Sequence, residues 1–169
     1  GNKNIKYAGI NGFFNQDYSE VYHYKFWHEG IDFRGPTGTV VRSLIHGKVI
    51  VCGKRKMKNG VNKGGVIAIQ SISDPLLFFF ALHVDENSFQ VSPGQIIVPD
   101  QALCKTMKMD APHLHVSAIR IKSLDHFSKY VISGSHPNFT LPYWYPSSNW
   151  KYVINPFDTT NKKNTWEGY

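Results

Sequence analysis

Short apolar runs separated by turn residues recur through the middle of the chain, and a helical period is almost absent. The pattern predicts strands over five segments, residues 39–43, 48–52, 66–71, 76–84 and 95–98. Turn and breaker residues separate them, among them His46 and Gly47, Asp74 and Pro75, and Ser92, Pro93 and Gly94. Short strands with frequent turns predict an all-β fold, an antiparallel sandwich or barrel.

The two flanks carry weaker patterns, and we expect both to belong to the same domain. Residues 1–27 predict an irregular lead-in with one or two short strands, and residues 28–120 form the core of the domain. Residues 121–169 predict an aromatic-rich extension, with a last strand near 152–157 and a polar tail. Its aromatic side chains are expected to cover a sheet edge rather than to stack on sugar rings.

Composition and charge limit the classes of partner. A chain of 169 residues with 41% hydrophobic residues fits one globular domain. The net charge of +7 favours polyanions, which include nucleic acid, acidic lipid and an anionic cell wall. The basic cluster at residues 54–58 runs into a turn at Asn59 and Gly60, which indicates a solvated hairpin tip and not a nucleic-acid arm.

No window of the sequence approaches a membrane span, so no integral membrane segment is expected. The two cysteines, Cys52 and Cys104, lie in no metal-binding pair. Buried thiols and one disulfide both stay open at this point.

Two histidine-containing segments suggest a metal centre. His28 and Asp32 are four residues apart, with the helix-disfavouring Gly30 and Ile31 between them. Much later, His113 and His115 are two residues apart, so on a strand both side chains face the same way. Catalytic zinc takes three protein ligands of these types and keeps one position open, so the set predicts a zinc site with one histidine to spare.

Five segments in this order carry a family resemblance: residues 28–40, 45–49, 65–69, 91–95 and 112–115. They resemble the lysostaphin/LytM-type zinc metallopeptidases, endopeptidases that cut the peptide part of bacterial peptidoglycan. The resemblance covers about half of the chain. It implies a compact antiparallel β fold with the site in a groove, a monomer with one zinc ion, and a place in the cell envelope, periplasmic or extracellular.

The resemblance also implies roles for five residues. His28, Asp32 and His115 would bind zinc, and His83 and His113 would assist catalysis. We expect His113 to be the base and His83 the oxyanion partner. Strand alternation alone would put His83 on the face shared by Ala81 and Phe79.

Three departures from the family pattern are expected to affect substrate choice more than metal binding. The loop over residues 103–112 lacks the usual glycines, Ala81 replaces a tyrosine, and Val116 and Ser117 replace an aromatic residue and a glutamate. Glu29 is expected to face solvent. The remaining histidines are expected to be structural or exposed: His23, His46, His126 and His136.

Two other functions remain open from the sequence. The chain could be a non-catalytic module that binds cell wall or activates a peptidoglycan amidase, although such relatives usually lose ligands. It could also be a basic β-domain that binds another polyanion, with incidental histidines. The bond that a peptidase would cut is not determined by these residues.

Overall fold

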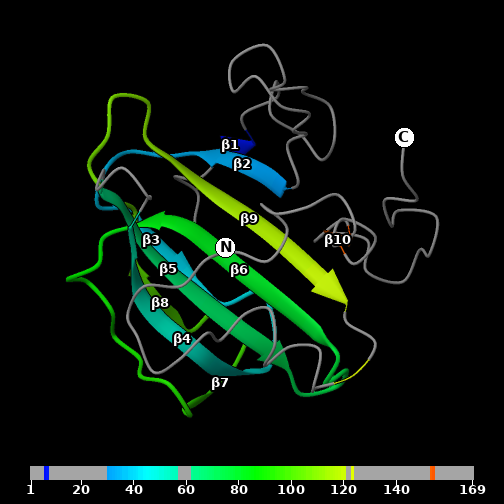
Figure 1. Ribbon diagram of the computed structural model, residues 1–169. Coiled ribbons are helices and arrows are strands. Elements are labelled where there is room, and N and C mark those ends of the chain that lie inside the picture. The colour runs from blue at the N-terminus through cyan, green and yellow to red at the C-terminus, as the bar shows by residue number, and fades with distance from the viewer. Residues whose placement is uncertain (1–5, 8–29, 57–61, 121–122, 124–152, 155–169) are drawn as a thin grey trace.

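The described part of the chain is built around one antiparallel sheet, with a two-stranded sheet packed against it (Figure 1). The computed structural model describes residues 6–7, 30–56, 62–120, 123 and 153–154. The larger sheet has the strand order β1-β2-β9-β6-β5-β4-β7, with β10 also paired to β9, and the smaller sheet is β3-β8. The strands are β1 (Lys6–Tyr7), β2 (Gly30–Arg34), β3 (Val40–Arg42), β4 (Gly47–Lys56), β5 (Asn62–Ser71), β6 (Leu77–Val84), β7 (Ile96–Ile97), β8 (Ala102–Lys105), β9 (His113–Arg120) and β10 (Val153–Ile154).

The central strand β6 is apolar on both faces because both faces are buried. Phe78 and Phe80 on one face are each 1% exposed, and Leu77 and Phe79 on the other are 6% and 7% exposed. The strand pairs with β5 on one side and β9 on the other, so its backbone groups are also satisfied. This double burial explains the longest apolar run of the sequence.

The hydrophobic core lies between the two sheets. Val41 of β3 and Leu103 of β8 belong to the same buried cluster as Ile67 of β5 and Leu114 of β9. Cys104 is buried in this cluster and Cys52 packs against it, and both are free thiols. The two sheets therefore hold each other in place through one shared apolar layer.

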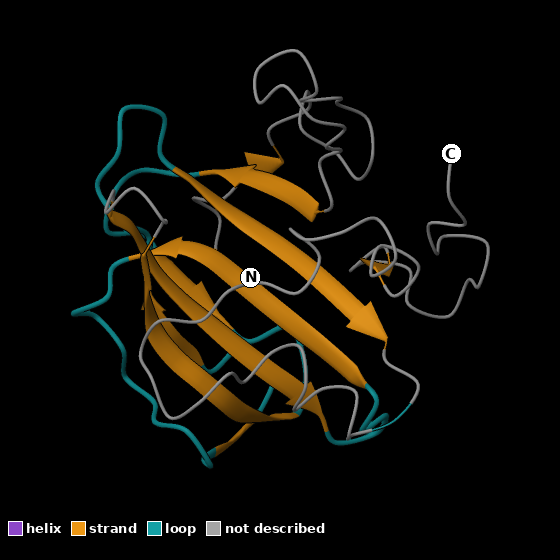
Figure 2. Cartoon of the chain, in the orientation of Figure 1, coloured by secondary structure: helices purple, strands orange, loops and turns teal. Residues whose placement is uncertain are grey.

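The all-β prediction is confirmed, since the described residues contain strands, turns and loops only (Figure 2). All five predicted strands are present, and β4 and β5 are longer than predicted because they pair as a hairpin up to Lys56 and Asn62. The tip of that hairpin lies outside the described residues, as do most of the two flanks. Within the flanks, β1 and β10 fall where short strands were expected.

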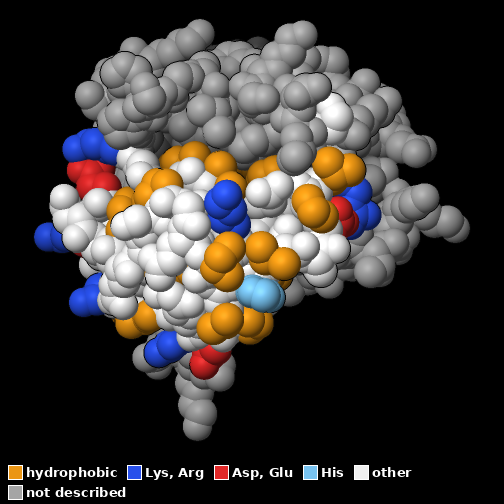
Figure 3. Space-filling model, turned by 90° about the horizontal axis from the view of Figure 1, so that it is seen from below, with side chains coloured by type: hydrophobic (Ala, Val, Ile, Leu, Met, Phe, Trp, Pro, Cys, Tyr) orange, Lys and Arg blue, Asp and Glu red, His pale blue; other side chains and the backbone are white. Residues whose placement is uncertain are grey.

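Several large hydrophobic side chains of the described residues are exposed. Ile72 donates its backbone N–H to the His46 carbonyl, and Ile96 pairs with Lys48. Figure 3, the view from below, shows hydrophobic side chains together with a histidine and with Lys or Arg side chains. These exposed large hydrophobic residues are Leu44, Ile72, Ile96 and Val98.

Among the described residues, we find no helix with the length and hydrophobicity that a membrane span requires.

Candidate active site

The pairing of β2 with β9 brings the carboxylate and the two histidines of the sequence motifs together. Asp32 is directly opposite His115, and Arg34 is directly opposite His113. Opposed residues in an antiparallel pair project from the same face, as do residues two apart on one strand. Asp32, His113 and His115 therefore share one face of the sheet, as the two-residue spacing of the histidines predicted.

Asp32 and His115 form a buried, hydrogen-bonded pair. His115 Nδ1 lies 2.9 Å from Asp32 Oδ1, and the two residues are 5% and 3% exposed. A carboxylate buried to this extent is stable only with a polar partner, because burial without one is costly. The imidazole supplies that partner, so the two side chains form one polar unit within an apolar sheet.

His113 lies at the edge of this unit and is more accessible. Its Nε2 is 3.9 Å from Asp32 Oδ2, and its side chain is 21% exposed. Its Nδ1 is 2.8 Å from the carbonyl oxygen of Ala111. A carbonyl oxygen only accepts hydrogen bonds, so Nδ1 must carry the proton, and a neutral His113 has its lone pair on Nε2.

His83 reaches the same face through a β-bulge, and the prediction from simple alternation was wrong. Gly65 pairs with Val84 and Val66 pairs with Leu82, so His83 is the extra residue of β6. Its φ is 60°, in the left-handed region. A bulge re-aims side chains in this way and is common beside active sites.

The bulge directs the ring of His83 toward the other two histidines. Its centroid lies 4.7 Å from that of His113, with 64° between the ring planes, and 6.4 Å from that of His115. Regular alternation would have placed His83 with Ala81, which faces the core. Sequence reasoning from the residues alone could not detect the extra residue.

Gly30 is a site residue whose role the sequence reasoning missed. A Cβ built at Gly30 would lie 2.5 Å from His115 Nε2 and 2.5 Å from the Val116 carbonyl oxygen. Only glycine leaves room for the imidazole at this point of β2. The signal in the sequence is the glycine itself, which lies midway between His28 and Asp32.

The third expected ligand, His28, lies outside the described residues, as do Glu29, His23, His126 and His136. Within the described part of the chain, no group of three or more His, Cys, Asp or Glu side chains is arranged to hold a metal ion. Of the three expected zinc ligands, the described residues therefore include only Asp32 and His115. His46 is exposed, as expected.

Asp32 and His115 fit a shared zinc ion. Zinc binds nitrogen and oxygen ligands at about 2.0–2.2 Å, so two ligand atoms of a tetrahedral site lie about 3.3 Å apart. The observed 2.9 Å between Asp32 Oδ1 and His115 Nδ1 needs to open only slightly. Metal binding requires a deprotonated ligand, so zinc would replace the proton that these atoms share.

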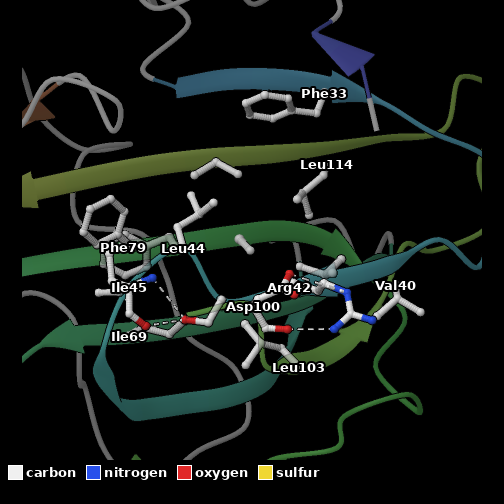
Figure 4. Close-up of a pocket in the computed structure, with 15 residues that line it drawn as sticks. Phe33, Val40, Arg42, Leu44, Ile45, Ile69, Phe79, Asp100, Leu103 and Leu114 are labelled. Carbon is white, nitrogen blue, oxygen red and sulfur yellow. Dashed lines mark hydrogen bonds and ion pairs between the residues drawn. The ribbon is translucent and has the colours of Figure 1, made fainter. Parts of the chain in front are cut away.

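An apolar cavity among the described residues (Figure 4) lies on the face of the sheet opposite Asp32 and His115 and is not part of this site. It has a volume of about 260 Å³ and is lined by Phe33, Leu114 and Phe79 of the sheet and by Leu44 and Leu103 opposite them. Arg42 at its rim donates to the Asp100 carbonyl oxygen at 2.7 Å. The cavity is therefore a gap in the core where the two sheets separate.

Two of the residues that depart from the family pattern line this cavity and not the candidate site. Ala81 and Val116 line it and pair with each other across β6 and β9. The expectation that these two positions affect substrate choice is corrected, because they lie on the face opposite Asp32. Ser117, by contrast, shares the face of His115 and is fully buried.

Comparison with known proteins identifies the family. Residues 26–126 match the model of peptidase family M23, a span that contains all five expected site residues. The chain belongs to peptidase family M23. The resemblance noted in the sequence is therefore confirmed. No match was found among curated proteins.

Solved structures similar to this M23 chain include larger peptidases. A zinc-containing peptidase from Vibrio cholerae is 30% identical, with a TM-score of 0.47, over 58% of this chain and 28% of that one. Lysostaphin is 20% identical, with a TM-score of 0.52, over 73% of this chain and 50% of that one. Csd3 of Helicobacter pylori is 21% identical, with a TM-score of 0.50, over 69% and 30%.

The likeness to lysostaphin and Csd3 shows a shared fold. The chain spans half or less of the length of these three relatives. Membership of the M23 family supports peptidase activity for this chain.

Proposed function

We propose that this chain is a zinc-dependent endopeptidase that hydrolyses the peptide cross-links of bacterial peptidoglycan. The observation that carries the proposal is the buried Asp32–His115 pair, with the rings of His113 and His83 beside it, inside the segment that matches the M23 family. A carboxylate, two accessible imidazoles and one buried imidazole on a single sheet face are the groups that metal-assisted hydrolysis requires.

His28, Asp32 and His115 are the proposed zinc ligands. Asp32 and His115 supply an oxygen and a nitrogen 2.9 Å apart, and His28 precedes Gly30 by two residues in the sequence. Bound zinc would polarise the scissile carbonyl group and lower the pKa of water at the site. Gly30 would keep the space beside His115 open.

His113 is the proposed general base. Its Nδ1–H is engaged by the Ala111 carbonyl, so the lone pair of the neutral ring is on Nε2, the nitrogen nearer to Asp32. A neutral imidazole of this kind accepts a proton from the attacking water and returns it to the leaving amine. Its 21% exposed side chain gives it access to substrate.

His83 is the proposed oxyanion partner. It lies farther from His115 than from His113, and it is only partly buried. A ring N–H in this position donates a hydrogen bond to the oxygen on which charge develops. His113 is assigned the role of base because the lone pair of its neutral ring is on Nε2, and the remaining role is assigned to His83.

The proposed setting is the cell envelope, with peptidoglycan as substrate and one zinc ion per monomeric chain. The net charge of +7 supports contact with an anionic wall.

The test is release of soluble peptides from purified peptidoglycan by the zinc-loaded protein, with Asp32→Ala as the inactive variant and His46→Ala as a matched control at an exposed histidine. We expect release by the wild type and by His46→Ala only. Binding to sedimented peptidoglycan without any release would instead support a wall-binding or amidase-activating module.

A further inference from the structure

The backbone of His83 adopts a conformation that needs support from outside its own strand. Its φ of 60° is unusual for a residue with a side chain, and within the described residues only Asp100 shares this property among non-glycine residues. Such a conformation persists when neighbouring structure holds it. The neighbours of His83 therefore determine where its ring points.

The segment formed by the last residue of β8 and the two residues after it holds the backbone on both sides of the bulge. Asp85 donates its N–H to the Lys105 carbonyl oxygen at 2.8 Å, and Val84 forms a β-bridge with Thr106. Met107 donates its N–H to the carbonyl oxygen of His83 itself at 2.9 Å. Residues 105–107 thus contact residues 83–85, which include His83.

Thr106 fixes this segment to the turn that follows β2. Its N–H donates to the Thr39 carbonyl oxygen at 2.9 Å, and its hydroxyl donates to the Pro36 carbonyl oxygen at 2.8 Å. Thr39 in turn donates its N–H to Thr106 Oγ1 at 3.0 Å. Thr106 is 2% exposed, so these hydrogen bonds are protected from solvent.

The side chain of Met107 lies across Gly64 on β5. A Cβ built at Gly64 would overlap Met107 Sδ and would lie 2.9 Å from the carbonyl oxygen of Val84. Gly64 also has a φ of 77°, which favours glycine. Both atoms that an added methyl group would displace belong to residues that flank or hold His83.

We infer that Gly64 and Met107 are positioning residues that hold the ring of His83 toward His113. The Met107 side chain fits the space that Gly64 leaves open, and this contact fixes the Met107 N–H that holds the His83 carbonyl. The inference rests on the proposed function of His83 for its catalytic consequence. Its structural consequence, the placement of the His83 ring, can be measured separately.

The test compares Gly64→Ala with Gly94→Ala. Gly94 has a φ of 90° and nothing within 4 Å of an added Cβ, so its variant has a similar backbone strain without the overlap. The readouts are the ring signals of His83 in NMR spectra, assigned by their loss in His83→Asn, and kcat and KM for peptide release.

In Gly64→Ala we expect shifted His83 ring signals and a kcat lower by about 10- to 100-fold, with KM changed by less than about twofold, since small misplacements of a catalytic group have effects of this size. Gly94→Ala is expected to match the wild type in both readouts. His83 signals and kcat in Gly64→Ala that equal those of Gly94→Ala would overturn the inference.

A second pair of variants covers the case in which Gly64→Ala does not fold. Met107→Ala removes the side chain that packs on Gly64, and Met107→Leu keeps a side chain of similar volume. We expect shifted His83 signals in the first and restored signals in the second. If the wild type releases no peptide, the proposed function fails, whereas the NMR comparison still decides whether Gly64 and Met107 position His83.

Discussion

At the residue scale, the site depends on a few polar side chains that are stable in the sheet because they bond to one another. Asp32 and His115 bury their charge-bearing atoms together, and His113 uses one ring nitrogen for a backbone carbonyl and directs the other toward Asp32. Under the proposed function, this arrangement would separate metal binding, by Asp32 and His115, from proton transfer, by His113. Substitutions at the two kinds of residue should therefore have different signatures.

The first prediction concerns His113. Its replacement by alanine should lower kcat by about 10²- to 10⁴-fold, the usual contribution of general acid–base catalysis, while zinc content stays at the wild-type level. Peptide-release kinetics and elemental analysis of the same samples measure both. Loss of zinc in His113→Ala would show that this residue is a ligand, contrary to the assignment.

The second prediction concerns the two thiols. Burial raises the pKa of Cys52 from 9.0 to about 11, and burial also raises the pKa of Cys104. At pH 8 the reactive thiolate form of Cys52 is thus about 100-fold rarer than for an ordinary thiol, and its fraction increases as pH rises toward 11. Thiol titration at pH 8 should label both cysteines slowly in the native protein and rapidly in denaturant. An absence of labelling in denaturant without reductant would reveal a disulfide.

At the element scale, the strands could be predicted from the sequence, and their arrangement could not. Alternation and turn residues such as Asp74 and Pro75 indicate where strands begin and end, because those signals are local. The pairing of Asp32 with His115 joins residues 83 positions apart and depends on tertiary packing. The resemblance to a family predicted only that these two residues would belong to one site.

The bulge at His83 and the role of Gly30 show the limit of local patterns. A bulge adds one residue without a reliable sequence signal, and it reverses the face on which the following side chain lies. The closeness of Gly30 to His115 Nε2 appears only when β2 and β9 are paired. Both features depend on contacts between strands.

The third prediction tests the core on which these strands pack. Ile67 is completely buried in β5, and Ile72, the residue directly after the end of that strand, is 44% exposed. Ile67→Ala should lower the free energy of unfolding by about 2–5 kcal/mol, as for other large-to-small core changes. Ile72→Ala should change it by less than about 0.5 kcal/mol. Urea unfolding of the two variants gives the comparison, and equal effects would contradict the described core.

At the scale of the whole molecule, the net charge should affect how strongly the protein binds its proposed substrate. With a formal charge of +7, binding to an anionic cell wall should weaken as salt screens the attraction. The fourth prediction is that the fraction bound to sedimented wall decreases steadily as sodium chloride rises from about 0.05 to 0.5 M, where the Debye length falls below about 5 Å. Binding that does not change with salt would assign recognition to uncharged contacts.

The central claim is that His28, Asp32 and His115 together hold one zinc ion. The most direct measurement is zinc stoichiometry by elemental analysis of the wild type, of His28→Ala and of the control His46→Ala. The account predicts one zinc per chain in the wild type and in His46→Ala, and loss of zinc in His28→Ala. Folded wild-type protein that takes up no zinc on reconstitution, or a His28→Ala variant that keeps a full equivalent, would contradict it.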